Sequence, residues 1–165
     1  MRFYSFFSIL LLLFIGCQPK SEIESIDLAA EKNEINIKLE NYHTVSKAKD
    51  FDAYKDFLTD DGLFCGTDPE EFWDNEQWLG LVEKSFANKS RVSNYSIEKR
   101  EIKVAANGIS AIAVEQISGL RLSKKILARV VYHFVKTDDD WKVDFLSWAL
   151  VPKNDDLSKL NEALE

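Results

Sequence analysis

Residues 95–118 read YSIEKREIKVAANGISAIAVEQIS, and this stretch decides the fold class. Apolar and polar residues alternate on both sides of Asn107 and Gly108. Such alternation is typical of half-buried β-strands, and Asn-Gly is the strongest short hairpin signal. The pattern therefore predicts two antiparallel strands, over residues 95–104 and 109–118, joined by a tight turn.

The sheet extends on the C-terminal side of this hairpin. Residues 126–136 and 141–151 are rich in β-branched and aromatic side chains, and Pro152 ends the second run. Both runs read as further strands. In the first strand of the hairpin the apolar parity shifts between Ile97 and Ile102, which predicts a β-bulge.

The N-terminal half has the apolar period of helices. Residues 26–49 contain no Pro or Gly, and Ile35, Leu39 and Tyr42 recur at helical spacing. This spacing predicts one long amphipathic helix. Asp50 can cap a second, shorter helix directly after it.

A third helix is predicted over residues 69–88, after a turn at 60–62 and a short strand at 63–65. Thr67 or the aspartate after it can cap this helix, proline suits its first position, and Asp74 offers a second cap. Helices followed by a run of strands predict an α+β fold. N-terminal helices would then pack on one face of a mostly antiparallel sheet.

The N-terminus has the pattern of a secretory signal. A positive tip precedes an apolar run at residues 3–15, which is too short to span a membrane. Gly16 and Cys17 follow this run. The stretch resembles the lipobox of bacterial lipoproteins, in which the cysteine receives acyl chains. We expect a signal peptide at residues 1–16 and a lipidated tether at residues 17–25.

Lipid on Cys17, such as palmitate, would attach the protein to the bilayer of a bacterial envelope. Two or more acyl chains give a lasting anchor, whereas one holds only reversibly. In lipoproteins an aspartate after the cysteine often retains the protein at the inner membrane. Gln18 therefore favours the outer membrane, and the leaflet stays open. The alternative is a plain secretory signal with a chance cysteine.

Composition limits the classes of partner. A mature chain of about 150 residues suits one domain. The net charge of −7 and pI near 5.0 argue against nucleic acid, which needs clustered Lys and Arg, and against electrostatic adhesion to anionic lipid. Cys65 is left without a disulfide partner and is expected to be a small buried residue. With only two histidines, we expect no metal and no cofactor.

Three segments resemble the SnoaL-like branch of the nuclear transport factor 2-like superfamily. They are DFDAY at 50–54, GTDPEEFW at 66–73 and WKV at 141–143. The resemblance covers nearly all of the mature chain and assigns residues 26–152 to a SnoaL-like domain and residues 153–165 to a polar tail. It implies a cone in which helices lie across a strongly curved sheet, with a pocket at the open end.

The resemblance leaves the activity open. Some relatives are isomerases, cyclases or dehydratases, many others only bind or assemble, and members often form homodimers through their sheets. Relatives often carry His-x-His-x-Ser along the last strand, where this chain has Phe145, Ser147 and Ala149. This departure puts acid–base chemistry at that end of the pocket in doubt.

Two residues are candidates for a catalytic acid or base, namely Glu115 and His133. Glu115 lies in an apolar strand, and we expect it to point out of the sheet to water; the alternative is the pocket. Only one of His133 and Tyr132 can face the pocket, because neighbouring side chains on a strand face opposite ways. We favour Tyr132 inward. Asp144 is expected to be an outward, solvated residue.

An apolar pocket wall with a few polar points is the usual form of a ligand site. The candidate ligand-binding residues are Tyr54, Phe64, Trp73, Trp78, Gln116, Tyr132, Phe145 and Ser147. The alternative is that the aromatic side chains simply fill the core. Two functions stay open: a membrane-anchored module that binds a small apolar ligand or assembles, or a small-molecule isomerase or hydro-lyase.

Overall fold

The computed structural model describes residues 26–88, 94–120, 125–138 and 140–164. The predicted signal peptide, Cys17 and the tether lie outside these residues. Four helices, one 3₁₀ turn and six strands follow one another along the described chain. They are α1 (Leu28–Ala48), α2 (Phe51–Lys55), β1 (Leu58–Cys65), β2 (Phe72–Asp74), α3 (Asn75–Ala87), β3 (Ser96–Val104), β4 (Ser110–Ser118), β5 (Leu127–Thr137), β6 (Asp140–Val151), the turn Asn154–Asp156 and α4 (Leu157–Glu162).

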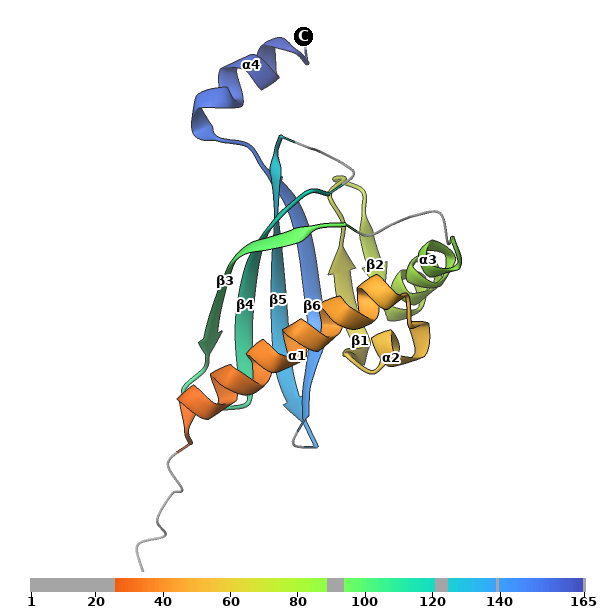
Figure 1. Cartoon of the computed structure of the whole chain (residues 1–165), viewed down its shortest axis with the longest axis vertical. Coiled ribbons are helices and arrows are strands. Elements are labelled where there is room, and N and C mark those ends of the chain that lie inside the picture. The colour runs from red at the N-terminus through yellow and green to blue at the C-terminus, as the bar shows by residue number, and fades with distance from the viewer. Residues whose placement is uncertain (1–25, 89–93, 121–124, 139, 165) are drawn as a thin grey trace, which may run out of the picture.

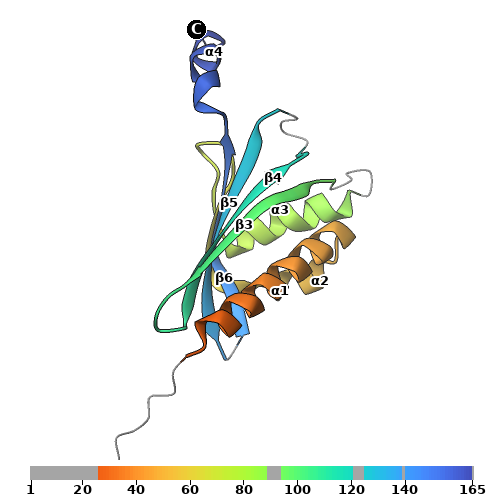
Figure 2. The same ribbon diagram turned by 60° about the vertical axis from the view of Figure 1, so that its left-hand side comes forward.

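The six strands form a single curved sheet in the order β2-β1-β6-β5-β4-β3. The pair β1–β6 is parallel, and the other strand pairs are antiparallel. Helices α1, α2 and α3 cover one face, and α1 runs diagonally across it (Figures 1 and 2). The predicted α+β fold class is confirmed, including the helices on one face of a mostly antiparallel sheet.

The hairpin that decides the fold forms as predicted. Gly108 has φ 67°, a left-handed conformation that favours glycine. The register of β3 against β4 shifts between Ile97 and Lys99, which confirms the predicted bulge. After this bulge, Arg100 and Ile102 share the inward face that Ile97 occupies before it.

The predicted start of the third helix is wrong. Residues 66–71 form a hairpin loop, in which the Gly66 N–H donates to the Glu71 carbonyl (3.0 Å) and the Glu71 carboxylate accepts from the Asp68 N–H (3.0 Å). The next residues pair with β1 as the short strand β2. The helix begins only at the second predicted cap, Asp74, which forms a capping box with Gln77.

The predicted turn at residues 60–62 is also wrong. These residues belong to β1, which is longer than the predicted strand at 63–65 and starts at Leu58. The register against β6 is irregular between Leu58 and Leu63, so the acidic residues and Gly62 fit within a bent strand. Among the described residues no helix is both long enough and apolar enough to cross a membrane.

Candidate functional site

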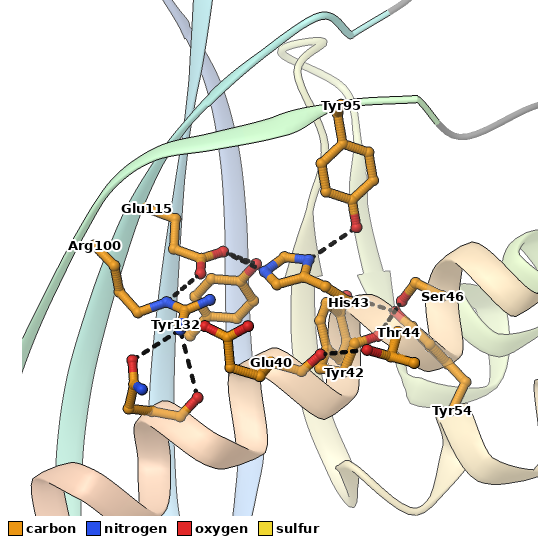
Figure 3. A network of polar contacts seen from close by, with 11 residues as sticks. Glu40, Tyr42, His43, Thr44, Ser46, Tyr54, Tyr95, Arg100, Glu115 and Tyr132 are labelled. Carbon is orange, nitrogen blue, oxygen red and sulfur yellow. Dashed lines mark hydrogen bonds and ion pairs between the residues drawn. The ribbon is translucent and has the colours of Figure 1, made fainter.

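Glu115 is a carboxylate buried completely between the sheet and α1 (Figure 3). Its exposure is 0%, and it shares the inward face of β4 with Ala111, Ala113 and Ile117. The favoured prediction, that Glu115 points to water, is therefore wrong. Alternation places it among small and apolar residues that all face the helices.

Three donors from three different elements surround this carboxylate. Oε2 lies 2.7 Å from His43 Nε2 of α1 and 2.9 Å from the Tyr132 hydroxyl of β5, while Oε1 lies 2.6 Å from Arg100 Nε of β3. Burial raises the pKa of Glu115, but the hydrogen bonds and charges of His43 and then Arg100 outweigh it. The pKa therefore lies below its ordinary value, and the carboxylate is ionised.

His43 lies in line between the carboxylate and a phenol. Because an ionised carboxylate only accepts, Nε2 carries a hydrogen, and Nδ1 faces the Tyr95 hydroxyl at 2.8 Å. Nδ1 accepts from Tyr95 when the imidazole is neutral and donates to it when the imidazole is protonated. Burial and then the charge of Glu115 raise the pKa of Tyr95, so the phenol stays protonated.

Arg100 connects the buried carboxylate with the surface of α1. Its Nη1 lies 2.8 Å from Asn36 Oδ1 and 2.6 Å from Glu40 Oε1 (Figure 3). Glu40 is exposed, whereas the Arg100 side chain is only 11% exposed. The cation is thus held between one buried and one exposed carboxylate. A small groove of about 290 Å³ between α1 and β3 reaches Arg100 from outside.

A second polar pair is formed by the hydroxyls of Tyr42 and Tyr54, and it has one more donor hydrogen than it has acceptors. The two hydroxyls lie 3.1 Å apart, and Trp78 Nε1 donates to the Tyr54 hydroxyl at 3.1 Å. One of the two O–H hydrogens bridges the oxygens, and the other has no acceptor among the described residues. Burial raises the pKa of Tyr54 to about 12, so both phenols remain neutral donors. A ligand or water oxygen could accept this hydrogen.

Comparison with protein families identifies this arrangement of helices and strands. The model of the SnoaL-like domain matches residues 35–145. The chain belongs to the SnoaL-like domain family. The match spans the interval from α1 to the middle of β6 and includes His43, Arg100, Glu115 and Tyr132.

Solved structures support the same fold for this SnoaL-like domain. An NTF2-like protein of unknown function from Pseudomonas putida KT2440 has 14% identity and a TM-score of 0.64 over 73% of this chain and 87% of that one. A protein with a cystatin-like fold from Caulobacter vibrioides has 13% identity and a TM-score of 0.64 over 82% and 99%. An NTF2-like protein of unknown function from Shewanella oneidensis MR-1 has 18% identity and a TM-score of 0.59 over 71% and 97%. A search of curated proteins finds no match.

Five of the predicted ligand-binding residues lie together inside the SnoaL-like domain. Tyr54, Phe64 and Tyr132 are buried, and Tyr132 faces inward as expected. Trp73 and Trp78 are partly buried against the same core. The Phe64 and Trp78 rings stack at 5.4 Å, and Trp73 lies 5.5 Å from Trp78. These aromatic side chains are continuous with the Tyr42–Tyr54 pair.

The other three predicted ligand-binding residues lie on the opposite face of the sheet. Gln116, Phe145 and Ser147 alternate with buried residues and point away from the helices. They cannot line one pocket with Tyr132. Ala149 faces outward too, so all three positions of the missing His-x-His-x-Ser motif lie on the outer face. Their absence therefore says nothing about chemistry between the sheet and the helices.

His133 also lies on the outer face of the sheet. Its Nδ1 is 2.6 Å from Asp144 Oδ1, and both side chains are partly exposed. The structure therefore does not bring His133 to Glu115. Asp144 faces outward as expected, but it is paired with His133 rather than only solvated.

His43, Arg100 and Tyr95 were not among the sequence candidates. A signal existed for His43, which follows Ile35 and Leu39 at four-residue steps on the buried stripe of α1. A polar residue in such a stripe needs a buried partner. Arg100 is harder to recognise, because the exact position of the bulge decides which face it occupies.

No group of three or more His, Cys, Asp and Glu residues in the described part of the chain could hold a metal ion. Cys65 is partly exposed rather than buried, and desolvation raises the pKa of its thiol. A groove of about 780 Å³ lies between α1, α2 and the start of β6, and its lining includes Lys38, Phe57 and Trp141. None of its lining residues belongs to the network around Glu115.

Proposed function

We propose that this SnoaL-like domain binds a small, mostly apolar molecule with an oxygen acceptor and acts on it as an isomerase or hydro-lyase. The observation that carries the proposal is the line Glu115–His43–Tyr95, in which an ionised carboxylate orients an imidazole toward a phenol. A base held by a third group is the arrangement that activates groups for proton transfer. Buried aromatic side chains beside it suit an apolar ligand.

The residues divide the chemistry as follows. His43 takes a proton from the ligand at Nδ1, either directly or through Tyr95, and Glu115 stabilises the imidazolium that forms. The spare hydroxyl hydrogen of Tyr42 and Tyr54 binds the ligand oxygen where negative charge develops. His43 then returns the proton, to another carbon in an isomerase or to a departing hydroxide, giving water, in a hydro-lyase.

A ligand screen by thermal shift, followed by NMR of each hit, tests this function. We expect a hit to be converted by the wild type, bound without conversion by His43→Gln, and converted normally by the outer-face control His133→Gln. If His43→Gln still converted the ligand, His43 would not be the catalytic base. A ligand that binds wild type and is never converted would favour a binding module.

The alternative is a binding or assembly module that forms homodimers through the outer sheet face. Leu63 and Ile112 expose 45% and 47% of their surface on this face. Leu63 pairs with the half-buried Phe145, and Ile112 lies in the same row across the sheet, next to His133. Single exposed apolar residues are ordinary, but neighbouring ones favour a protein contact. Light scattering should give a dimer mass that Ile112→Lys reduces to a monomer mass; a monomeric wild type would exclude this interface.

We also propose that acyl chains on Cys17 anchor the protein to the bacterial envelope, with Gln18 favouring the outer membrane. The support is the order of positive tip, short apolar run, Gly16 and Cys17. Cys17→Ser should abolish labelling by a palmitate analogue and release or misprocess the protein. Unchanged mass and membrane retention in that variant would refute the anchor.

A further inference from the structure

Three large apolar side chains are exposed at the end of the domain from which the chain leads back to Cys17. They are Ile26 (45% exposed), Leu28 (39%) and Ile109 (58%). Ile26 directly precedes the cap of α1, and its Cγ2 lies 2.6 Å from where a β-carbon on Gly108 would be. Figures 1 and 2 show the start of α1 beside the β3–β4 hairpin in both views. We call Ile26, Leu28 and Ile109 the apolar tip.

The length of chain before the tip determines how far it can lie from an anchored Cys17. Nine residue steps separate Cys17 from Ile26. Even fully extended they reach about 30 Å. Helix α1, with 21 residues, is itself about 31 Å long. Ile26 therefore always lies within about 30 Å of an anchored Cys17, whereas Tyr95 and α3 lie toward the other end of α1 (Figure 1) and can be about twice as far from it.

The charges around the tip favour an apolar contact over an electrostatic one. Asp27 caps α1 beside the tip, and Asp138 lies in the neighbouring β5–β6 turn. Asp140 is paired with Lys38 at 2.5 Å, so this lysine is not free to bind lipid phosphate. The chain as a whole carries −7. Two exposed lysines, Lys32 one turn after Leu28 and Lys103 on β3, lie on the same side, so the aspartates and lysines nearly offset each other and leave no excess of positive charge to attract anionic lipid.

We infer that the apolar tip docks into the interface between headgroups and acyl chains of the bilayer that holds Cys17. This inference rests on the anchor proposed above. Isoleucine and leucine side chains transfer favourably into this layer, and the anchor removes most of the cost of bringing them there. Docked in this way, the start of α1 points to the bilayer. Tyr95 and α3, toward the other end of α1, then lie on the side of the domain away from the lipid, so a ligand that reaches the buried Glu115–His43–Tyr95 line from that side arrives from water (Figures 1 and 3).

Spin labels on the full acylated chain test the inference. The chain is purified from bacterial membranes, its acyl mass is verified, and it is reconstituted into phosphatidylcholine vesicles. In a Cys65→Ser background, Ile109→Cys places a nitroxide on the tip. Leu81→Cys is the matched control, because Leu81 is 41% exposed on α3, away from the tip. Both positions are exposed, so neither substitution disturbs the core.

We expect the label at position 109 to collide several-fold more often with oxygen, relative to a water-soluble nickel complex, than the label at position 81. Added phosphatidylglycerol should leave this ratio unchanged or lower it. Equal ratios at the two positions in an acylated, vesicle-bound chain would overturn the docking while the anchor stands. A mass without acyl groups would remove the anchor and the docking together.

Discussion

Two histidine–carboxylate pairs lie on opposite faces of the same sheet. His43 and Glu115 meet at 2.7 Å with side-chain exposures of 8% and 0%, and His133 and Asp144 meet at 2.6 Å with exposures of 36% and 29%. The contact distances differ by only 0.1 Å, but the surroundings differ. Water screens the outer pair, whereas Arg100 and Tyr132 complete the inner one. Distance alone therefore says little about the role of such a pair.

Neutralising the buried carboxylate should have the largest effect. Glu115→Gln keeps the shape but presents an amide to three donors, and it leaves Arg100 without its buried counter-charge. We expect a loss of about 3 kcal/mol in the free energy of unfolding at pH 7, measured by urea denaturation. A loss below about 1 kcal/mol would mean that water reaches this carboxylate freely.

Lowering the pH should also reveal what the buried carboxylate contributes to stability. The pKa of Glu115 in the folded chain lies below its ordinary value of 4.5. Its stabilising contribution is therefore fully present above pH 4.5 and is lost as the pH falls through the folded-state pKa. The unfolding free energy of wild type should decrease over this range, and Glu115→Gln should flatten the decrease.

Glu31 contributes to the acid range in the same direction. The hydrogen bond from Lys136 lowers the pKa of Glu31, and burial opposes this only in part. Some acid dependence should therefore survive in Glu115→Gln and become smaller when Glu31→Gln is added. If Glu115→Gln left the wild-type acid profile unchanged, its carboxylate would not be the ionised centre of the network.

The sequence predicted the sheet much better than it predicted this network. Alternation over residues 95–118 determines the strands, since each apolar side chain must reach the core. The network depends on details that alternation does not contain. The bulge between Ile97 and Lys99 turns Arg100 inward, and the pairing of Arg100 with Glu115 across β3 and β4 then supplies the counter-charge. When that contact is not known, a glutamate in a strand is best predicted to point to water.

The two histidines differ in how far local pattern reaches. His133 was a candidate base, but strand geometry sends it to the face opposite Tyr132, and the favoured inward orientation of Tyr132 is the one observed. His43 sits in a helix, four residues after Leu39, and its partner is 72 residues away in sequence. Contacts of this range follow from the packing of α1 across the sheet, which no local pattern specifies.

Removing one hydroxyl at the outer end of the inner line should have an intermediate effect. Tyr95→Phe deletes the partner of His43 Nδ1 and keeps the ring that packs against the imidazole at 5.6 Å. We expect a loss of about 1 kcal/mol by urea denaturation. A change of the ring itself, Tyr95→Leu, should cost more, because it removes the ring contact as well as the hydroxyl. No loss in Tyr95→Phe would show that the hydroxyl contributes nothing.

The outer pair should give the smallest effect. Asp144→Asn removes the charge beside His133 at a partly exposed site, where such pairs contribute roughly 0–1 kcal/mol. We expect a loss below about 0.5 kcal/mol that vanishes in concentrated salt, because solvent ions screen an exposed pair. A loss as large as that of Glu115→Gln would contradict the contrast between the faces. It would mean that another molecule covers the outer face in solution. If the loss also depended on protein concentration, that molecule would be a second copy of the chain.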